Sequence, residues 1–505
     1  MTALVWFKRD LRIDDHQPLY QAARHGAVLP VYIIEPDYWQ QSDVSLRHWQ
    51  FISAALVQLN TKLQALGQPL LIAKGPASTT LRYLCQQYGI SAVYSHEETG
   101  NLWTYQRDLA VKRLLRSLNI PWHQYRQFAV FRRLNNRDNW FTLADNWLKS
   151  AVTPTVSSLP FIVQPDWNLS ALAPTRATDL PLCQSWQSAT AATQTSDSFF
   201  ATRCSSYRQH ISLPAQAVQS CSRLSPFISY GMLSLRQLQQ QSYLAMKTAK
   251  KPRHIQGLQA FFSRLRWHCH FIQKLEDEPA IEFFNMHRGF DGLRETDFNP
   301  TYFQAWKTGT TGYPLIDAAM RSLLATGWLH FRARAMLVAF ASYHLWLHWR
   351  PVALHLAQCF IDYEPGIHYP QIQMQAGTTG INPNRMYNPI IQSQQKDARG
   401  LFIRQWLPEL SSVPDSWIHT PWLMPLSMQQ QHGCLIGLDY PAPVVELQQA
   451  QQSARAKIRQ WLTQQDHLRW QQQQQAVFIR HASRKRPVAN KTNNVKNQLS
   501  FNWQP

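Results

Sequence analysis

Two hydrophobic periodicities alternate over the first 130 residues of the chain. Short apolar runs rich in β-branched residues, which are typical of buried strands, lie at residues 2–7, 28–34, 69–75, 91–96 and, more weakly, 121–126. Between these runs, apolar side chains recur at helical spacing over residues 46–66, 78–88 and 103–118. Strands that alternate with helices predict a parallel sheet covered on both faces, which is a Rossmann-like α/β fold. No GxGxxG follows the first run, so the usual dinucleotide fingerprint is missing.

Beyond a separating segment that follows residue 130, the hydrophobic pattern becomes helical. Apolar positions follow helical spacing over residues 199–468 and predict an all-α domain, with the strongest helices at residues 253–275, 314–327 and 330–349. Residues 131–198 separate the two regions, and their richness in Pro, Ser, Thr and Ala from about residue 153 is typical of an interdomain linker. Residues 469–505 form a basic, glutamine-rich tail that we expect to be partly disordered.

Charge and cysteine usage narrow the class of protein. The 505 residues carry a net charge of +20, which favours a polyanionic partner such as nucleic acid. The start, MTALVWFKRD, has charges where a signal peptide needs an apolar run. Seven scattered cysteines without a CxxC spacing fit reduced thiols, so we expect a cytoplasmic protein without an iron–sulfur cluster. The most apolar internal stretch, residues 335–347, is shorter than a membrane span, so we expect no membrane contact.

The stretch SCSRLSPFISYG, residues 220–231, is a candidate phosphate site. Ser222 and Ser225 flank a turn that leads into a predicted helix, where hydroxyls and free backbone N–H groups suit a phosphate. An ordinary helix cap has the same pattern. Tyr207, upstream, covers the same site in the first interpretation and packs in the core in the second.

A second candidate lies in FFSRLRWHCHF, residues 261–271. The spacing of Arg264, Trp267 and His268 places them on one side of a predicted helix. An arginine and a tryptophan presented together suit a stacked planar ligand or a nucleobase. A core tryptophan beside a surface arginine is the alternative.

The third candidate is IDYEPGIHYPQIQMQAGTTG, residues 361–380. Asp362, Glu364 and His368 lie within seven positions of a basic chain, and Pro365-Gly366 is expected to break any regular element there. A metal ion, an acid–base pair and a cation partner all fit such residues. Arg334 is the favoured partner for Asp362, because a buried acid needs a cation or several donors. Neither HxxxH nor GxSxG accompanies the stretch, so we expect no metal and no serine nucleophile.

Taken together, the motifs resemble the photolyase/cryptochrome family, and within it a divergent bacterial DNA photolyase. The motifs are LVWFKRDLRIDDHQPL (4–19), SRLSPFISYG (222–231), the tryptophan-centred helix at 261–271, AWKTGTTGYPLIDAAMRSLLATGWLH (305–330) and FIRQWLPEL (402–410). The resemblance implies an α/β antenna domain and a helical domain that holds a U-shaped FAD. It implies light-driven repair of UV-induced pyrimidine dimers in DNA by electron transfer from photoexcited reduced FAD. The alternative within the family is a cryptochrome-type blue-light receptor without repair activity.

The resemblance also assigns roles to residues. Arg334 and Asp362 match an ion pair beside the isoalloxazine, Glu364 matches an acceptor at the N–H edge of the flavin, and His368 takes the place that faces flavin N5. The other residues implied to contact FAD are Tyr207, Cys221, Ser222, Arg223, Leu224, Ser225 and Arg264. The residues implied to act in catalysis are Trp267, Trp349 and His368, and those implied to contact DNA are Trp267, His268, His330 and Met374.

Several positions depart from the family pattern. Ile372 replaces the tryptophan that starts the electron relay to the flavin, Met374 replaces a lesion-packing tryptophan, and His368 replaces an asparagine. Arg264 and Phe331 stand where dimer-repairing relatives have glutamate and asparagine. Trp349 still matches the middle of the relay, and the candidates for an alternative path are Tyr363, Tyr369, Trp346 and Trp349.

A second pigment is the remaining open question of the sequence. Glu97 and Glu98, in SHEETGNLWTYQRD (95–108), lie where many relatives contact an antenna chromophore. Methenyltetrahydrofolate, a deazaflavin and no pigment at all are each compatible with the sequence, as is a solvated turn. We expect the protein to be a monomer that binds UV-damaged DNA.

Overall fold

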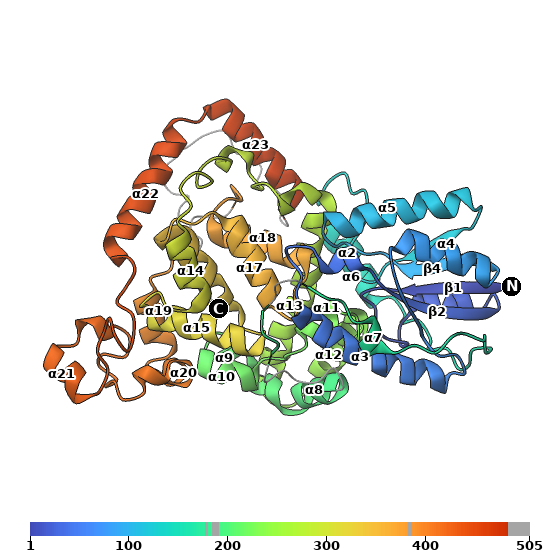
Figure 1. Ribbon diagram of the computed structural model, residues 1–505, viewed down its shortest axis with the longest axis horizontal. Helices are drawn as coiled ribbons and strands as arrows, with labels where there is room; N and C mark the ends of the chain where they lie inside the picture. Colours follow the sequence, from blue (N-terminus) through green and yellow to red (C-terminus); the bar gives the residue numbers. More distant parts are fainter. Residues whose placement is uncertain (177–179, 184–190, 382–385, 483–505) are drawn as a thin grey trace.

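The computed structural model describes residues 1–176, 180–183, 191–381 and 386–482 (Figure 1). Its first part is a parallel sheet of five strands in the order β3-β2-β1-β4-β5. The strands are β1 (Thr2–Phe7), β2 (Ala27–Ile34), β3 (Leu71–Lys74), β4 (Ile90–His96) and β5 (Trp122–Tyr125). Each lies within or next to an apolar run of the sequence, and the α/β prediction is confirmed.

Helices cover both faces of this sheet. Alternate residues of a strand point to opposite faces, so Val5 and Phe7 pack with the helices α1 (Gln17–Ala23) and α3 (Leu46–Ala65). Leu4 and Trp6 pack on the other side with helices α4 (Ala77–Gln87) and α5 (Leu102–Ser117). The short helix α2 (Pro36–Trp39) follows β2. We call the sheet with these helices the α/β domain.

Much of the segment predicted as a linker runs along the α/β domain. The backbone N–H of Leu159 donates to the Leu66 carbonyl at 2.6 Å, and the Trp167 indole donates to the Leu70 carbonyl at 2.7 Å. The described parts of the segment also hold the helices α6 (Trp140–Lys149), α7 (Leu169–Leu172) and α8 (Ala192–Ser198). Proline-rich composition therefore marks an extended, docked segment here, and its boundaries remain predictions.

The rest of the described chain is predominantly helical, with α13 packed against α9, α12 and α18. We call it the helical domain. Its α-helices are α9 (Cys204–His210), α10 (Pro214–Ser220), α11 (Ser225–Ser229), α12 (Leu235–Thr248), α13 (Pro252–Asp277), α14 (Pro300–Thr308), α15 (Pro314–Thr326), α16 (Phe331–Ala339), α17 (Trp349–Cys359), α18 (Pro365–Ala376), α19 (Pro389–Lys396), α20 (Leu401–Trp406), α21 (Leu426–Gln431), α22 (Leu447–Thr463) and α23 (His467–His481).

The single helix predicted at residues 330–349 is wrong. Helix α16 passes into a π-helical turn, Phe340–His344, and α17 starts only at Trp349. Between them Trp346 has a φ of 54°, in the left-handed region that non-glycine residues rarely adopt. Tertiary contacts hold it there, because its indole donates to Asp297 at 3.2 Å and is packed against nearby cations.

The expected break at Pro365-Gly366 is also wrong, because these residues begin α18. Proline fits the first turn of a helix, where its missing N–H costs no hydrogen bond. Gly366 lets α18 approach α13 closely, since a Cβ atom there would lie 2.7 Å from the Ile272 Cα. The stretch that looked like a loop is therefore a helix that positions His368 and Ile372.

The predicted tail begins inside a helix. Helix α23 runs to His481, and Trp470 packs on His287 with ring centroids 4.1 Å apart. The glutamine run at 471–475 is thus helical, while residues 483–505 lie outside the described part of the chain. None of the described helices combines the length and the apolarity that a bilayer crossing requires.

Candidate functional site

The pair Arg334–Asp362 lies where α16 and the turn before α18 meet. The guanidinium donates to both carboxylate oxygens, at 3.0 and 2.8 Å, and its Nε donates to the Leu329 carbonyl at 2.8 Å. The Asp362 side chain is 3% exposed, but that of Arg334 keeps 27% exposure. The sequence-predicted pair is therefore formed, and one side of the planar cation stays open to a ligand.

Residues 221–225 form a fixed turn between α10 and α11. Arg203 donates to the carbonyls of Cys221 and Ser222, the latter at 3.2 Å. Arg223 has a φ of 60° and stacks on the Trp328 ring at 4.1 Å. Burial lowers the pKa of Arg223 to about 10. Leu224 is fully buried and Ser225 begins α11. The segment predicted to cradle phosphates is thus held in one conformation by two arginines.

Tyr207 and Arg264 join this region from α9 and α13. The Tyr207 side chain is buried against Phe199, with ring centroids 5.5 Å apart, and Arg264 hydrogen-bonds its hydroxyl. Burial raises the pKa of Tyr207, so the hydroxyl stays protonated. The ring of Tyr207 packs in the core, and a place for its hydroxyl at a phosphate stays a prediction. Its contact with FAD stays a prediction.

His368 lies in the first turn of α18. One ring nitrogen, Nε2, lies 2.9 Å from the Ala353 carbonyl of α17, which can only accept a hydrogen bond, so Nε2 carries the proton. Burial lowers the pKa of His368 to about 4, so the ring is neutral at pH 7. Its Nδ1 is then an acceptor only.

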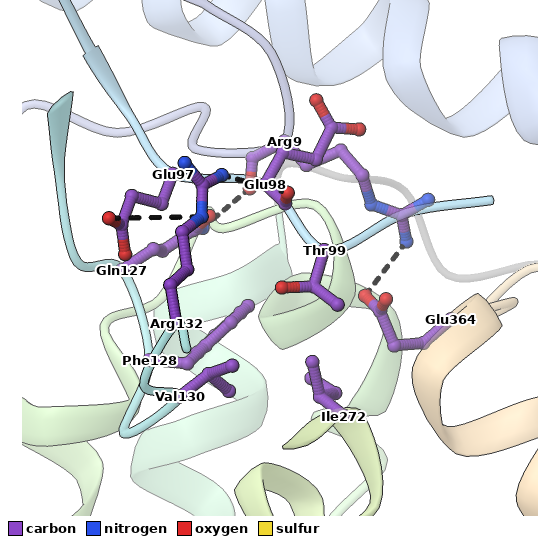
Figure 2. Close-up of a pocket in the computed structure, with 10 residues that line it drawn as sticks. All are labelled: Arg9, Glu97, Glu98, Thr99, Gln127, Phe128, Val130, Arg132, Ile272 and Glu364. Atoms are coloured by element: carbon purple, nitrogen blue, oxygen red, sulfur yellow. Dashed lines mark hydrogen bonds and ion pairs between the residues drawn. The ribbon is translucent and has the colours of Figure 1, made fainter. Parts of the chain in front are cut away.

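Glu364 has a partner that sequence reasoning missed. Its carboxylate pairs with Arg9, 355 residues upstream in the loop after β1, at 3.2 Å (Figure 2). Arg9 also donates to the carbonyls of Tyr363, at 2.7 Å, and Ser229, at 3.0 Å. Burial raises the pKa of Glu364 to about 7. The KRDLR motif, which contains Arg9, could have indicated a functional residue here, but the sequence does not show that its partner is Glu364.

A small pocket opens beside this pair, between the two domains. Figure 2 shows Glu97 pointing toward Arg132, with Phe128 and Ile272 forming an apolar side. Burial would raise the pKa of Glu98, but Arg107 and Lys8 outweigh it and lower the pKa to about 2. The two glutamates therefore lie at a pocket, and their contact with a second pigment stays a prediction.

A buried cluster in the α/β domain has the residue types of a metal site. One Asp10 oxygen accepts from His16 Nε2 at 2.9 Å and from His96 Nδ1 at 2.7 Å. Burial lowers the pKa of both histidines, that of His96 to about 3. Hydrogen bonds between neutral rings and the carboxylate thus account for the cluster, which connects β1, α1 and β4.

Two residues predicted to contact DNA, His268 and His330, are shielded from solvent in this structure, and their DNA contacts stay predictions. His268 packs on Phe128 of the α/β domain, at 4.8 Å between ring centroids, and both its ring nitrogens are shielded from solvent. His330 is 5% exposed and lies beside Arg334. Helical spacing alone did not show that a second domain covers His268. Its neighbour Trp267 is 38% exposed, and Met374 is partly exposed, so their DNA contacts remain predictions.

The comparisons with known proteins bear on the whole chain. The family model described as DNA photolyase matches residues 3–134, and that described as the FAD binding domain of DNA photolyase matches residues 261–460. A deoxyribodipyrimidine photo-lyase of Salmonella typhimurium is 33% identical over 484 residues, which cover 89% of this chain and 96% of the relative. The chain belongs to the photolyase/cryptochrome family.

The proteins similar to this chain include both cryptochromes and photolyases. A cryptochrome DASH of Synechocystis is 28% identical and is covered to 98%, with 91% of this chain matched. The crystal structure of a bacterial class III photolyase from Agrobacterium tumefaciens superimposes with a TM-score of 0.80 at 25% identity, covering 92% of this chain and 98% of that one. The fold is thus shared with proteins named photolyases and proteins named cryptochromes.

The residues present fit FAD, the cofactor of this family's helical domain. Arg334 offers an open cationic face beside a buried carboxylate, as a planar polar ring requires. Ser222 is partly exposed beside the rigid Arg223 turn. His368 offers a neutral acceptor.

The interruption of the aromatic relay at Ile372 stays a prediction from the sequence. Ile372 is buried on α18, in the core cluster that also holds Trp349. The Trp349 indole donates to the Asn285 side chain at 2.8 Å, so the tryptophan has a fixed orientation.

Replacement of Ile372 by tryptophan is expected to speed light-driven reduction of bound FAD several-fold, because an indole would extend the aromatic path toward Trp349. The bleaching of the flavin absorbance under blue light with added thiol measures the rate. Ile372→Leu is the matched control, and thermal melting reports overpacking, which costs about 1–3 kcal/mol in a filled core. An unchanged rate in a folded Ile372→Trp protein contradicts the interruption.

Proposed function

We propose that this protein is a light-driven DNA repair enzyme that splits UV-induced pyrimidine dimers. The observation that carries the proposal is the arrangement of α13. Arg264 on this helix binds Tyr207 beside the 221–225 turn, and three residues further along Trp267 presents an exposed indole. An aromatic surface next to a flavin site suits a base that has been flipped out of the duplex.

The charge of the chain supports a DNA substrate. A net charge of +20 favours binding to DNA phosphates, with an affinity that depends on salt and not on the DNA sequence. Phe331, 50% exposed at the start of α16, adds a second apolar surface for an unstacked base. When bound, reduced FAD supplies on blue-light absorption the electron that splits the dimer. The chain binds the lesion, orients it and excludes water.

A blue-light receptor is the second candidate. It is favoured by the substitutions at lesion-facing positions, where Arg264, Phe331 and Met374 replace the residues of dimer-repairing relatives. An exposed arginine at the Arg264 position cannot accept a hydrogen bond from a lesion as the glutamate of those relatives can. Relatives of the receptor kind, such as cryptochrome-2 of Arabidopsis thaliana at 26% identity, match 89% of this chain.

The deciding assay is light-dependent restoration of oligonucleotides that carry either a cyclobutane dimer or a pyrimidine–pyrimidone photoproduct. The flavin is reduced chemically with dithionite, so the result does not depend on the aromatic relay. We expect repair of one of the two lesions under blue light and none in the dark. Intact FAD with no repair of either lesion would favour the receptor.

A further inference from the structure

Asp43 of the α/β domain is buried against two tyrosines of the helical domain. Its Oδ2 accepts from the Tyr363 hydroxyl at 2.5 Å and from the Tyr369 hydroxyl at 3.3 Å. The Asn101 amide donates to the same carboxylate at 3.0 and 3.3 Å. Asp43 is 3% exposed. Among the residues that the structure describes, it has no ion-pair partner, so neutral donors alone hold this carboxylate.

Such a carboxylate is a positioned base. A buried acid usually lies beside a cation, and here neutral hydroxyl and amide donors take that place. A second acid, Glu282, lies close enough to Asp43 that burial together with this charge raises its pKa to about 7. Burial and the same two acids keep the hydroxyl of Tyr369 protonated by raising its pKa. The tyrosine pair thus lies in a negative field with a proton acceptor in hydrogen-bond contact.

The pair borders the candidate flavin site. Tyr363 and Tyr369 pack on either side of His368, with ring centroids 5.2 and 5.5 Å from the imidazole. Tyr363 directly follows Asp362, the partner of Arg334. An electron that leaves either phenol therefore has a short path to a flavin held by that ion pair.

The charges around the other aromatic candidates argue against them. The Trp346 ring lies under the Arg294 guanidinium at 4.6 Å and the Lys457 ammonium at 4.9 Å, and its indole donates to Asp297, a half-exposed carboxylate that Lys457 already pairs with at 3.1 Å. Two cations disfavour the positive charge that an indole acquires on losing an electron. Trp349 donates only to the neutral Asn285 amide, which cannot remove its proton as a carboxylate can. The tyrosine pair combines a negative surrounding with a base.

We propose that Tyr363 and Tyr369, with Asp43 as proton acceptor, form a proton-coupled electron donor that replaces the relay interrupted at Ile372. The proposal rests on FAD bound at the Arg334–Asp362 site. One electron passes from the Tyr363 phenol to light-excited oxidised FAD. The O–H bond breaks and its proton moves to Asp43 Oδ2, which leaves a neutral phenoxyl radical and a carboxylic acid. A soluble thiolate, which is oxidised to a thiyl radical, returns one electron to the phenoxyl radical, and the proton returns from Asp43 to the phenol oxygen.

The test follows the radical and the rate of flavin photoreduction in the full chain loaded with FAD. After illumination and freezing, electron paramagnetic resonance is expected to show a tyrosyl signal in the wild type that is lost in Tyr363→Phe. Photoreduction is expected to slow at least about tenfold in Tyr363→Phe and Asp43→Asn, because a positioned base contributes about that much or more. The wild-type rate is expected to fall in D₂O.

Tyr313→Phe is the matched control. Tyr313 is a buried tyrosine whose hydroxyl donates to the Val445 carbonyl at 2.8 Å, and its loss is expected to leave the rate unchanged. FAD content and melting temperature separate a redox role from a structural one. A tryptophan radical with unchanged rates in Tyr363→Phe would overturn the proposal. If Asp43→Asn does not fold, the photoreduction rates of the wild type in H₂O and in D₂O are compared instead. Equal rates in the two solvents would contradict the proposal.

This outcome is independent of the repair activity. With chemically reduced FAD, Tyr363→Phe is expected to repair DNA as the wild type does, because the donor acts only in flavin reduction. A wild type that forms the tyrosyl radical without repair would contradict the proposed function alone. Repair without a tyrosyl radical would contradict the electron donor alone.

Discussion

Replacement of Asp362 by asparagine is expected to remove most of the bound FAD. Arg334 would keep its charge and lose the two-pronged contact that now orients it. Removing one partner of a buried ion pair costs about 3–5 kcal/mol, and the partial exposure of Arg334 favours the lower end. Because 1.4 kcal/mol is tenfold in affinity, we expect binding about a hundredfold weaker. Absorbance of the purified protein and titration of the apoprotein with FAD measure the change.

The matched control for this prediction is Asp297→Asn. Asp297 pairs with Lys457 at 3.1 Å, but its side chain is 49% exposed, so the same charge is removed at a solvated position. FAD content is expected to stay normal in that variant. Wild-type affinity for FAD in a folded Asp362→Asn protein would show that the ion pair has no part in binding the flavin.

Replacement of Trp267 by alanine is expected to abolish most of the preference for damaged DNA. Stacking of a base on an aromatic side chain is worth about 1–3 kcal/mol, so affinity for a dimer-containing oligonucleotide is expected to fall about ten- to hundredfold. Undamaged DNA stays stacked and is bound through its phosphates, so its affinity is expected to change little. Fluorescence anisotropy at one fixed salt concentration measures both affinities.

Tyr83→Ala controls for loss of an exposed aromatic ring, because Tyr83 is 62% exposed on α4 of the other domain. Trp267→Phe keeps a stacking surface and is expected to retain most of the preference. An equal loss of affinity for damaged and undamaged DNA in Trp267→Ala would contradict a role in reading the lesion.

The parts of the fold that local pattern determines were predictable. Alternating strands and helices specify the parallel sheet, since each apolar run is long enough for one strand and turns bound it. Arg334 and Asp362 were paired correctly because a buried acid needs a cation and because both residues match an ion pair of the family. The flavin-facing segment was misjudged as a loop, because Pro365-Gly366 signals a break in the absence of the α13 surface that Gly366 packs against.

Long-range partners were the part that the sequence did not reveal. Glu364 finds Arg9, and Tyr363 finds Asp43, over separations of 355 and 320 residues. Spacing rules describe only neighbours on one helix or strand, so neither contact has a local signature. The same limit explains His268, whose helical neighbours suggested an exposed face while Phe128 of the other domain covers it.

Arg9 has a consequence for how this chain can be divided. A guanidinium from the first 10 residues donates to Tyr363 and Glu364, the two residues between Asp362 and α18. The helical half therefore does not carry a complete flavin pocket of its own, although its sequence contains the residues assigned to the cofactor. Without the α/β domain, the helical domain would lack Arg9, so the Glu364 carboxylate and the Tyr363 carbonyl would lose their hydrogen-bond donor at the proposed edge of the flavin ring. In the proposed flavin site, the acid at the ring edge is therefore held by a residue from the beginning of the chain.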